Sequence, residues 1–148
     1  MEDEIRISAA SEADVPFIKS LLSQANLATD EVDGQWKMFV VARDGTKVVG
    51  CGGSEPYQFA AIIRSIAVDP TYRKQGIGRR LVRQLIDRLA SRGLREFYLL
   101  TTDGEEYFRK RGFKTIDRDE VHPQVLASRQ FQGECPDSAI CMRLVMLV

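Results

Sequence analysis

Residues 60–68 read Ala-Ala-Ile-Ile-Arg-Ser-Ile-Ala-Val, residues 73–80 read Arg-Lys-Gln-Gly-Ile-Gly-Arg-Arg, and residues 81–90 read Leu-Val-Arg-Gln-Leu-Ile-Asp-Arg-Leu-Ala. The first run is apolar on both faces apart from Arg64 and Ser65, which is typical of a central strand of a sheet. From Ile77 onward, apolar residues recur at helical spacing, and Gly93 follows where a left-handed cap is expected. This stretch therefore predicts a buried strand, a glycine-bearing turn and an amphipathic helix in succession.

The turn between the strand and the helix has the features of an anion site. Gly76 and Gly78 would let backbone N–H groups approach a ligand closely, and a helix start presents unpaired donors with a partial positive charge. From Arg73 to Arg95 there are eight basic residues and one acid, Asp87, so this neutral chain has a locally positive region. We expect the turn to bind a pyrophosphate. The cations best placed for phosphates are Arg73, Lys74, Arg79 and Arg80.

The rest of the chain alternates strands and helices around this stretch. The hydrophobic pattern predicts further strands at residues 5–9, 36–41, 47–53, 97–100, 113–116 and 140–148. Helices are expected from the Ser11 cap to about Gln24, at residues 104–111 and after Pro123. The acidic segment 26–34 predicts a short helix or a loop of the kind that forms substrate lids. Together these elements predict an α/β fold, a mixed sheet flanked by helices, in one domain spanning residues 1–148.

Composition argues against several classes of partner. The chain has 148 residues with 21 Lys+Arg and 21 Asp+Glu, so it lacks the surplus of cations that a general nucleic-acid binder needs. No apolar run approaches the roughly 20 residues that span a bilayer. The sequence begins Met1-Glu2-Asp3-Glu4, without a basic or apolar export region. We therefore expect a cytoplasmic protein with reduced thiols and with no nucleic-acid or membrane partner.

The cysteine and histidine pattern does not favour a metal centre. His122 is the only histidine, and the three cysteines are Cys51, Cys135 and Cys141. Cys135 and Cys141 could share a zinc ion with His122, but five residues separate them, whereas common zinc sites use a tight two-residue spacing. We therefore expect no metal.

Two familiar phosphate-binding motifs do not fit the turn. A Rossmann fingerprint needs a third small residue where Leu81 stands, and a Walker loop needs Gly-Lys-Ser/Thr. What remains is Arg-x-x-Gly-x-Gly after a strand that ends Ala-Val-Asp-Pro. In this pattern, and in the helix, strand and Gly112-Phe113 pair that follow, residues 4–116 resemble the GNAT family of N-acetyltransferases. The resemblance implies the acyl-CoA N-acyltransferase fold, with acetyl-CoA as cosubstrate.

The resemblance also implies roles for individual residues. Backbone amides of the turn would hold the CoA pyrophosphate, and the strand backbone at residues 66–68 would pair with the pantetheine arm. An N–H near Ala67 would stabilise the oxyanion, and Glu55 could accept the amine proton directly or through water, or be a plain turn carboxylate. The residues implied to contact acetyl-CoA are Ile66, Ala67, Val68, Arg73, Lys74, Gln75, Gly76, Ile77, Gly78, Arg79, Arg80 and Thr102.

Two positions depart from the family pattern. Phe108 stands where many members carry a tyrosine thought to protonate the CoA thiolate, and the adjacent Tyr107 points about 100° away on a helix. A water molecule or the substrate's own proton could replace that acid. Thr102 stands where an asparagine is often found, and its hydroxyl could still hydrogen-bond the pantetheine.

Arg64 is informative about the acceptor, because a cation on an apolar strand is costly unless an anion pairs with it. It could bind a substrate carboxylate, pair with an internal acid such as Glu55, or reach solvent. Segments 63–68, 99–102 and 131–139 resemble arsenic-resistance acetyltransferases of the ArsN type and, more distantly, amino-acid N-acetyltransferases. This implies a small amino-acid-like amine, or a glutamate mimic carrying phosphorus or arsenic, that attacks acetyl-CoA directly in a ternary complex. The expected pocket residues are Glu55, Arg64, Ser65, Thr101 and Thr102.

The sequence also has features that would suit two other functions and a homodimer. The acidic stretch 30–33 could attract a basic peptide, as in an acetyltransferase that acts on a protein lysine or N-terminus. Phe108 in place of tyrosine would suit a sensor that binds acetyl-CoA without turnover. The apolar segment 140–148 could be an internal sheet edge or contribute to a homodimer.

Overall fold

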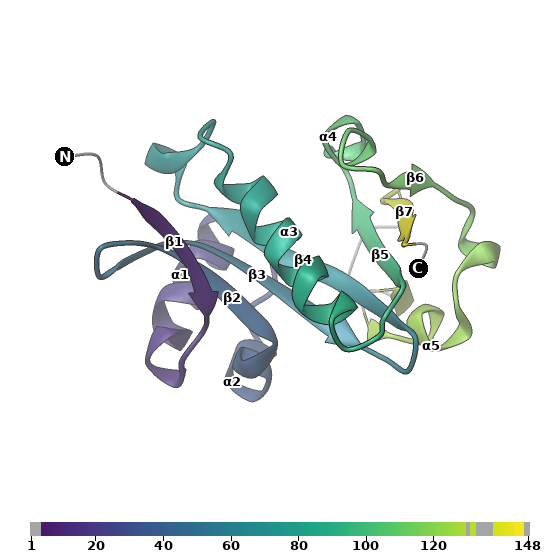
Figure 1. Ribbon diagram of the computed structural model, residues 1–148, viewed down its shortest axis with the longest axis horizontal. Coiled ribbons are helices and arrows are strands. Elements are labelled where there is room, and N and C mark those ends of the chain that lie inside the picture. The colour runs from purple at the N-terminus through teal and green to yellow at the C-terminus, as the bar shows by residue number, and fades with distance from the viewer. Residues whose placement is uncertain (1–3, 130, 133–137, 147–148) are drawn as a thin grey trace. The chain divides into compact units, whose positions relative to one another are not determined.

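The computed structural model describes residues 4–129, 131–132 and 138–146, which form two compact units (Figure 1). The first unit contains the chain up to Ser54 together with Ile63–Arg88. The second contains Glu55–Ile62 together with the chain from Leu89 onward. Strand β4, Ala60–Val68, therefore contributes its first three residues to the second unit and the remainder to the first.

The strands form a mixed sheet, and their order is β1-β2-β3-β4-β5-β7-β6. Strand β5 pairs in parallel with β4, and the pairs β1–β2, β2–β3, β5–β7 and β6–β7 are antiparallel. The predicted α/β fold class, a mixed sheet flanked by helices, is confirmed. Besides β4, the strands are β1 Ile5–Ala9, β2 Phe39–Asp44, β3 Lys47–Pro56, β5 Glu96–Thr101, β6 Lys114–Thr115 and β7 Ile140–Val145. The α-helices are α1 Val15–Gln24, α2 Val32–Gln35, α3 Ile77–Ala90, α4 Glu105–Arg109 and α5 Pro123–Leu126.

In the first unit, helices α1 and α2 lie on one side of strands β1 to β3, and α3 lies on the other side (Figure 1). The α1 and α2 side buries one apolar cluster that includes Ile18, Leu22, Val32, Cys51 and Ala67. Alternation along β3 turns Cys51 toward this cluster and the neighbouring glycines toward α3. A Cβ atom on Gly50 would lie 3.2 Å from the Leu81 side chain and 3.3 Å from Ile77, so the missing side chain lets α3 approach the strand closely.

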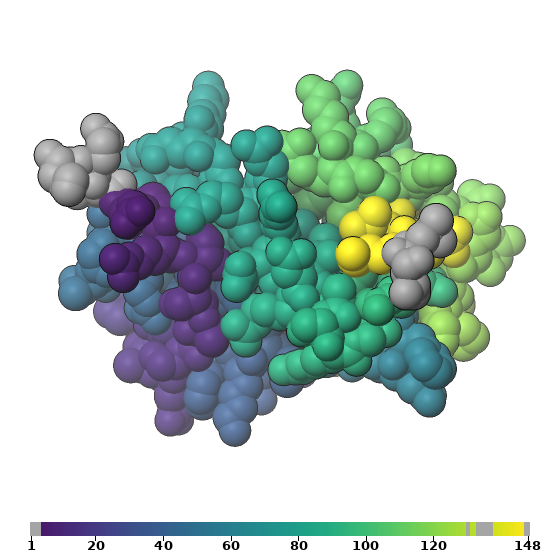
Figure 2. Space-filling model, viewed as in Figure 1, coloured from purple at the N-terminus to yellow at the C-terminus, as the bar shows by residue number. Residues whose placement is uncertain are grey.

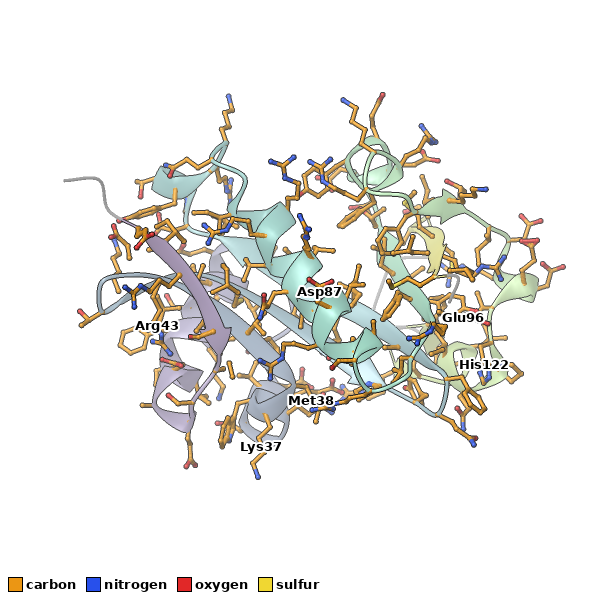
Figure 3. The ribbon with its side chains drawn as sticks, in the orientation of Figure 1. Lys37, Met38, Arg43, Asp87, Glu96 and His122 are labelled. Atoms are coloured by element: carbon orange, nitrogen blue, oxygen red, sulfur yellow. The ribbon has the colours of Figure 1, made fainter. Side chains whose placement is uncertain are left out.

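The second unit is built around β5. Residues Ala60–Ile62 of β4 pair with Glu96–Tyr98, and on its other edge β5 pairs with β7 from Glu96↔Val145 to Thr101↔Ile140. Tyr98 is 1% exposed in a cluster with residues of β4, α5 and β7. Its hydroxyl donates to Glu96 at 2.7 Å and accepts from the His122 backbone N–H at 3.3 Å. Figure 3 labels Glu96 and His122 in this unit.

Most element boundaries agree with the sequence prediction. Strands 5–9 and 60–68 and helix 77–90 match β1, β4 and α3, and Gly93 is left-handed at φ 96°. The helix predicted after Ser11 begins with a 3-10 turn, Glu12–Asp14, and continues as α1.

Several boundaries were wrong, and three of them concern whole segments or site residues. Residues Trp36–Met38 form a 3-10 helix, and the strand predicted from residue 36 begins at Phe39. Strand β3 continues to Pro56, so Glu55 lies on a strand end and not on a turn. The strand predicted at 113–116 is reduced to the two residues of β6.

The predictions for the cysteines, for the end of the last strand and for membrane-spanning segments can be compared only with the described residues. Cys51 and Cys141 are free and buried, whereas Cys135 and residues 147–148 of the predicted last strand lie outside the described residues. None of the helices in the described part of the chain has the length and hydropathy needed to cross a membrane.

Candidate functional site

A left-handed residue interrupts β4 in the first unit. Ser65 has φ 57°, which is uncommon for a side chain other than glycine. The side chain of Arg64 reaches a residue next to α2, but that of Ile66 lies beside Gly52 on the α3 face. In a regular strand residues 64 and 66 would share a face, so Ser65 forms a bulge that reverses the alternation.

The bulge lies beyond the part of β4 that pairs with β5. The register between the two strands consists of the pairs Ala60↔Glu96, Ala61↔Phe97 and Ile62↔Tyr98. Within the described residues, this register contains no β4 residue after Ile62. The strand segment predicted to contact the pantetheine arm, residues 66–68, is therefore outside the β4–β5 pairing.

The Cys51 thiol lies beneath the bulge. Its Sγ atom donates to the Ser65 carbonyl oxygen at 3.5 Å, and the Ala67 backbone N–H donates to the sulfur. Burial raises the pKa of Cys51 to about 12, against a smaller lowering by the Ala67 N–H. The thiol therefore stays protonated and acts as a weak hydrogen-bonding partner of the β4 backbone.

Several backbone N–H groups of the turn before α3 donate to none of the carbonyl groups of the described backbone. Lys74 and Gly76 are left-handed, with φ 67° and 80°. The Arg80 N–H donates to the Gly76 carbonyl at 3.1 Å, but within the described residues the N–H groups of 74–79 have no backbone acceptor. Successive N–H donors at the start of a 14-residue helix can bind a polyanion. The turn lies in the teal segment at the upper surface in Figure 2.

The four cations predicted for phosphate binding form two pairs, and the side chains of the first pair, Arg73 and Arg80, donate hydrogen bonds to the backbone. Arg73 donates to the Val68 carbonyl at 3.2 Å, and Arg80 donates to the Ile5 carbonyl at 2.7 Å. Both guanidinium groups are therefore held close to the turn by the backbone of neighbouring strands.

The second pair, Lys74 and Arg79, is exposed. A Cβ atom on Gly76 would lie 3.5 Å from the Arg79 guanidinium, which places that group beside the turn. The acid of this region, Asp87, lies further along α3, on the exposed side of the helix (Figure 3). Its negative charge is therefore two to three helical turns away from the donors at residues 74–79.

Arg64 is buried in an ion pair with Glu31, an acid that the sequence prediction did not single out. The guanidinium lies 2.6 Å from the Glu31 carboxylate, and the two side chains are 5% and 13% exposed. The Nε atom of Arg64 also donates to the Ser65 hydroxyl at 3.3 Å. Among the alternatives for Arg64, pairing with an internal acid is therefore confirmed, and Glu31 is such an acid.

The remaining predicted site residues lie in the second unit. Glu55 is half-buried and accepts a hydrogen bond from the Tyr57 hydroxyl at 3.3 Å. The Thr101 hydroxyl accepts from the Gly104 N–H at 2.8 Å, which places it at the start of α4, and Thr102 is exposed. The sequence prediction missed the partners of the site residues: Glu31, Tyr57 and Cys51.

Phe108, which stands where the family often has a tyrosine, packs among other aromatic side chains. Phe108 packs edge-on against Tyr107 and Phe113, at centroid distances of 5.1 and 5.7 Å. Tyr107 is 37% exposed, and the Arg111 guanidinium lies 4.6 Å from its ring centroid. Phe108 therefore has a packing role, and Tyr107 is held as an aromatic platform for a cation.

Comparison with protein families gives one match over most of the chain. The model described as the acetyltransferase (GNAT) family matches residues 9–117. The matched range contains β4, the turn and α3.

Several curated proteins are similar in sequence. An uncharacterised N-acetyltransferase of Chlorobaculum tepidum is 33% identical over 110 residues, covering 74% of this chain and 68% of that protein. An amino-acid acetyltransferase of Neisseria meningitidis is 25% identical over 126 residues, and one of Aeromonas salmonicida is 29% identical over 87 residues. These matches cover 79% and 57% of this chain, but only 29% and 20% of the two amino-acid acetyltransferases.

Solved structures share the fold. N-acetylglutamate synthase from Neisseria gonorrhoeae, complexed with coenzyme A and N-acetyl-glutamate, matches with a TM-score of 0.85 at 21% identity, over 100% of this chain and 36% of that one. A Mycobacterium tuberculosis protein in complex with CoA and NLQ matches with a TM-score of 0.81 at 25% identity, over 96% and 99% of the two chains.

Proposed function

This chain belongs to the acetyltransferase (GNAT) family, and on that premise we propose that it transfers the acetyl group of acetyl-CoA to the primary amine of a small amino-acid-like acceptor. The observation that carries the proposal is the run of N–H groups at residues 74–79, at the start of α3, for which the described part of the chain provides no backbone acceptor. A diphosphate would accept several of these hydrogen bonds at once, and the helix start favours its negative charge.

The proposed reaction is direct attack in a ternary complex. The neutral amine nitrogen attacks the thioester carbonyl carbon, a C–N bond forms, the C–S bond breaks and the CoA thiolate leaves. Glu55 is proposed to take the amine proton, directly or through water, and a water molecule or that same proton neutralises the thiolate. The Ala67 N–H is proposed to stabilise the oxyanion, and for this it must exchange the weak Cys51 sulfur for the carbonyl oxygen.

The proposed contacts to acetyl-CoA extend from the turn along β4. Backbone groups of residues 66–68 would pair with the pantetheine arm, because this part of β4 is outside the register with β5. Thr102 is proposed to contribute its hydroxyl to the same arm, and it is exposed.

Arg64 supports an acceptor that carries a carboxylate. A buried guanidinium can bind a carboxylate in a planar, bidentate geometry that a solvated lysine does not offer. Amino-acid acetyltransferases among the curated relatives also support an amino acid or a close analogue. Ser65 and Thr101 are proposed to complete the acceptor site.

The acidic segment gives little support to a basic peptide as acceptor. Glu31 is held by Arg64, and Asp33 pairs with Lys19 of α1. Two of the charges that would have attracted a peptide are therefore neutralised within the chain.

Thiol release from acetyl-CoA tests the proposal. We expect release with one or more free amino acids or amino-acid analogues, in a panel that includes glutamate and its phosphorus- and arsenic-bearing mimics. Basic peptides serve as the comparison group. Release with peptides alone would contradict the small-acceptor proposal, and acetyl-CoA binding without release across the panel would favour a sensor.

A further inference from the structure

The guanidinium proposed to receive the acceptor's carboxylate already holds a carboxylate from the same chain. Arg64 and Glu31 approach to 2.6 Å, and their side chains are 5% and 13% exposed. They lie 33 residues apart in the sequence, so the contact depends on the tertiary fold of the first unit. Because the pair is withdrawn from water, its two charges attract each other more strongly than those of a surface pair, and leaving one of them without a partner is costly.

Glu31 differs from its acidic neighbour in what it contacts. Asp33 pairs with Lys19 at the surface, where the two side chains are 68% and 36% exposed. Glu31 lies in a turn just before α2, outside any helix or strand. It is the N-cap residue of α2 and makes no side-chain capping hydrogen bond, so its carboxylate can leave Arg64 without removing a cap from the helix.

The charges at this position restrict what can bind. Glu31 already places one negative charge on the Arg64 guanidinium, and an acceptor carboxylate at the same group would add another. Like charges brought together in a partly dry environment repel strongly. A carboxylate-bearing acceptor therefore competes with Glu31 for Arg64, and an acceptor without a carboxylate does not.

We infer that Glu31 is a specificity-determining residue that competes with the acceptor's carboxylate for Arg64. The inference rests on the proposed function of Arg64 as an acceptor-binding residue. Exchange of one carboxylate for the other keeps Arg64 paired in both states. Glu31 thus lowers the affinity for every carboxylate ligand and selects for those that replace it well.

Binding of glutarate tests the inference without acetyl transfer, because this dicarboxylate has no amine. In ¹⁵N-labelled protein, the Arg64 Nε–H resonance is followed as glutarate is added. We expect Glu31→Gln to bind glutarate at least about tenfold more tightly than the unmodified protein, and Arg64→Gln to lose the binding. Asp33→Asn is the matched control on the same segment and should bind as the unmodified protein does. Glutaramide, which is neutral, should not distinguish Glu31→Gln from the unmodified protein.

Glutarate binding that is unchanged or weaker in Glu31→Gln would overturn the inference, because Glu31 would then be only a structural partner of Arg64. Should Glu31→Gln fail to fold, Glu31→Asp replaces it: a carboxylate withdrawn by one methylene should compete less well and give an intermediate affinity. An unchanged affinity in Glu31→Asp would count against competition. These results do not depend on turnover, so a failure to acetylate amino acids and a failure of carboxylate exchange are distinguishable.

Discussion

Glu55, the proposed base, is hydrogen-bonded to Tyr57. The hydroxyl of Tyr57, two residues after Glu55 in the chain, donates to the Glu55 carboxylate at 3.3 Å. Tyr57 also packs against the apolar cluster of the second unit, which limits its movement. Tyr57 is therefore a positioning residue for the proposed base.

Replacing Glu55 with glutamine should lower kcat by about 10²-fold at neutral pH, the usual contribution of a general base. The loss should shrink as the pH rises, because a larger share of the acceptor amine is then already neutral and needs no base. Steady-state kinetics across pH, with the acceptor found in the thiol-release panel, measures both effects.

Two tyrosine variants control for this result. Tyr57→Phe should give a smaller loss of kcat, since it removes only the hydrogen bond that orients Glu55. Tyr107→Phe should leave kcat unchanged, because the ring of Tyr107, not its hydroxyl, contacts Arg111 and Phe108. A pH-independent loss in Glu55→Gln would argue against a base, and a large loss in Tyr107→Phe would assign the missing acid to that residue.

Among single residues, those in local patterns could be predicted and those with distant partners could not. Gly76 could be predicted as a site residue because its left-handed conformation is set by the local turn and does not depend on distant parts of the chain. Glu31 could not be chosen over Asp30 or Asp33, because only the folded chain brings it to Arg64. The bulge at Ser65 has no signal of its own in an apolar strand.

At the scale of elements, Asp14 connects the start of α1 to β2. It accepts from the Ser11 N–H at 2.8 Å, and its two carboxylate oxygens accept from Arg43 at 3.0 and 2.6 Å. Figure 3 labels Arg43 on β2, beside α1. Burial alone would raise the pKa of Asp14, but the bonds from Arg43 and Ser11 outweigh it and lower the pKa below its ordinary value of 3.8.

Asp14→Asn should therefore destabilise the protein in a pH-dependent way. A carboxyl group with a lowered pKa contributes stability above its ordinary pKa, and that contribution disappears as the pH falls through the folded-state pKa. We expect a loss of about 2 kcal/mol in the free energy of unfolding at pH 7, typical of hydrogen bonds to a charged group. The difference should decline below about pH 3.8.

Urea unfolding from pH 7 down to pH 3 measures this difference. Glu12→Gln, an exposed position in the same turn, is the matched control and should not change the free energy of unfolding. A difference between Asp14→Asn and the unmodified protein that persists at low pH would mean that shape, and not charge, holds α1 to β2.

Elements with a strong local period were predictable, and those whose period is ambiguous were not. Helix α3 repeats its apolar residues over 14 positions, and β4 is apolar along nearly its whole length. Trp36, Met38 and Val40 alternate like a strand, but Trp36 instead packs against the cluster beneath α1 and α2, and the chain there forms a 3-10 helix. Tertiary packing therefore overrides the alternating pattern.

At the scale of the whole molecule, the fold class could be predicted but the strand order could not. Alternating strands and helices indicate a mixed sheet. The last strand, β7, pairs with β5 and β6 and so lies between two strands that precede it in the sequence. That insertion depends on long-range pairing, for which the sequence pattern carries no signal.

The central claim is that the backbone N–H donors of residues 74–79 bind the diphosphate of acetyl-CoA, and a calorimetric titration tests it directly. The unmodified protein should bind acetyl-CoA with a dissociation constant in the micromolar range, and Gly76→Asp should weaken binding at least about 100-fold by adding a side chain and a negative charge to a left-handed position. Gly93→Ala also imposes backbone strain, at φ 96° three residues after the last residue of α3, and should bind as the unmodified protein does. No heat of binding from the folded, unmodified protein, or equal affinity in Gly76→Asp, would contradict the claim.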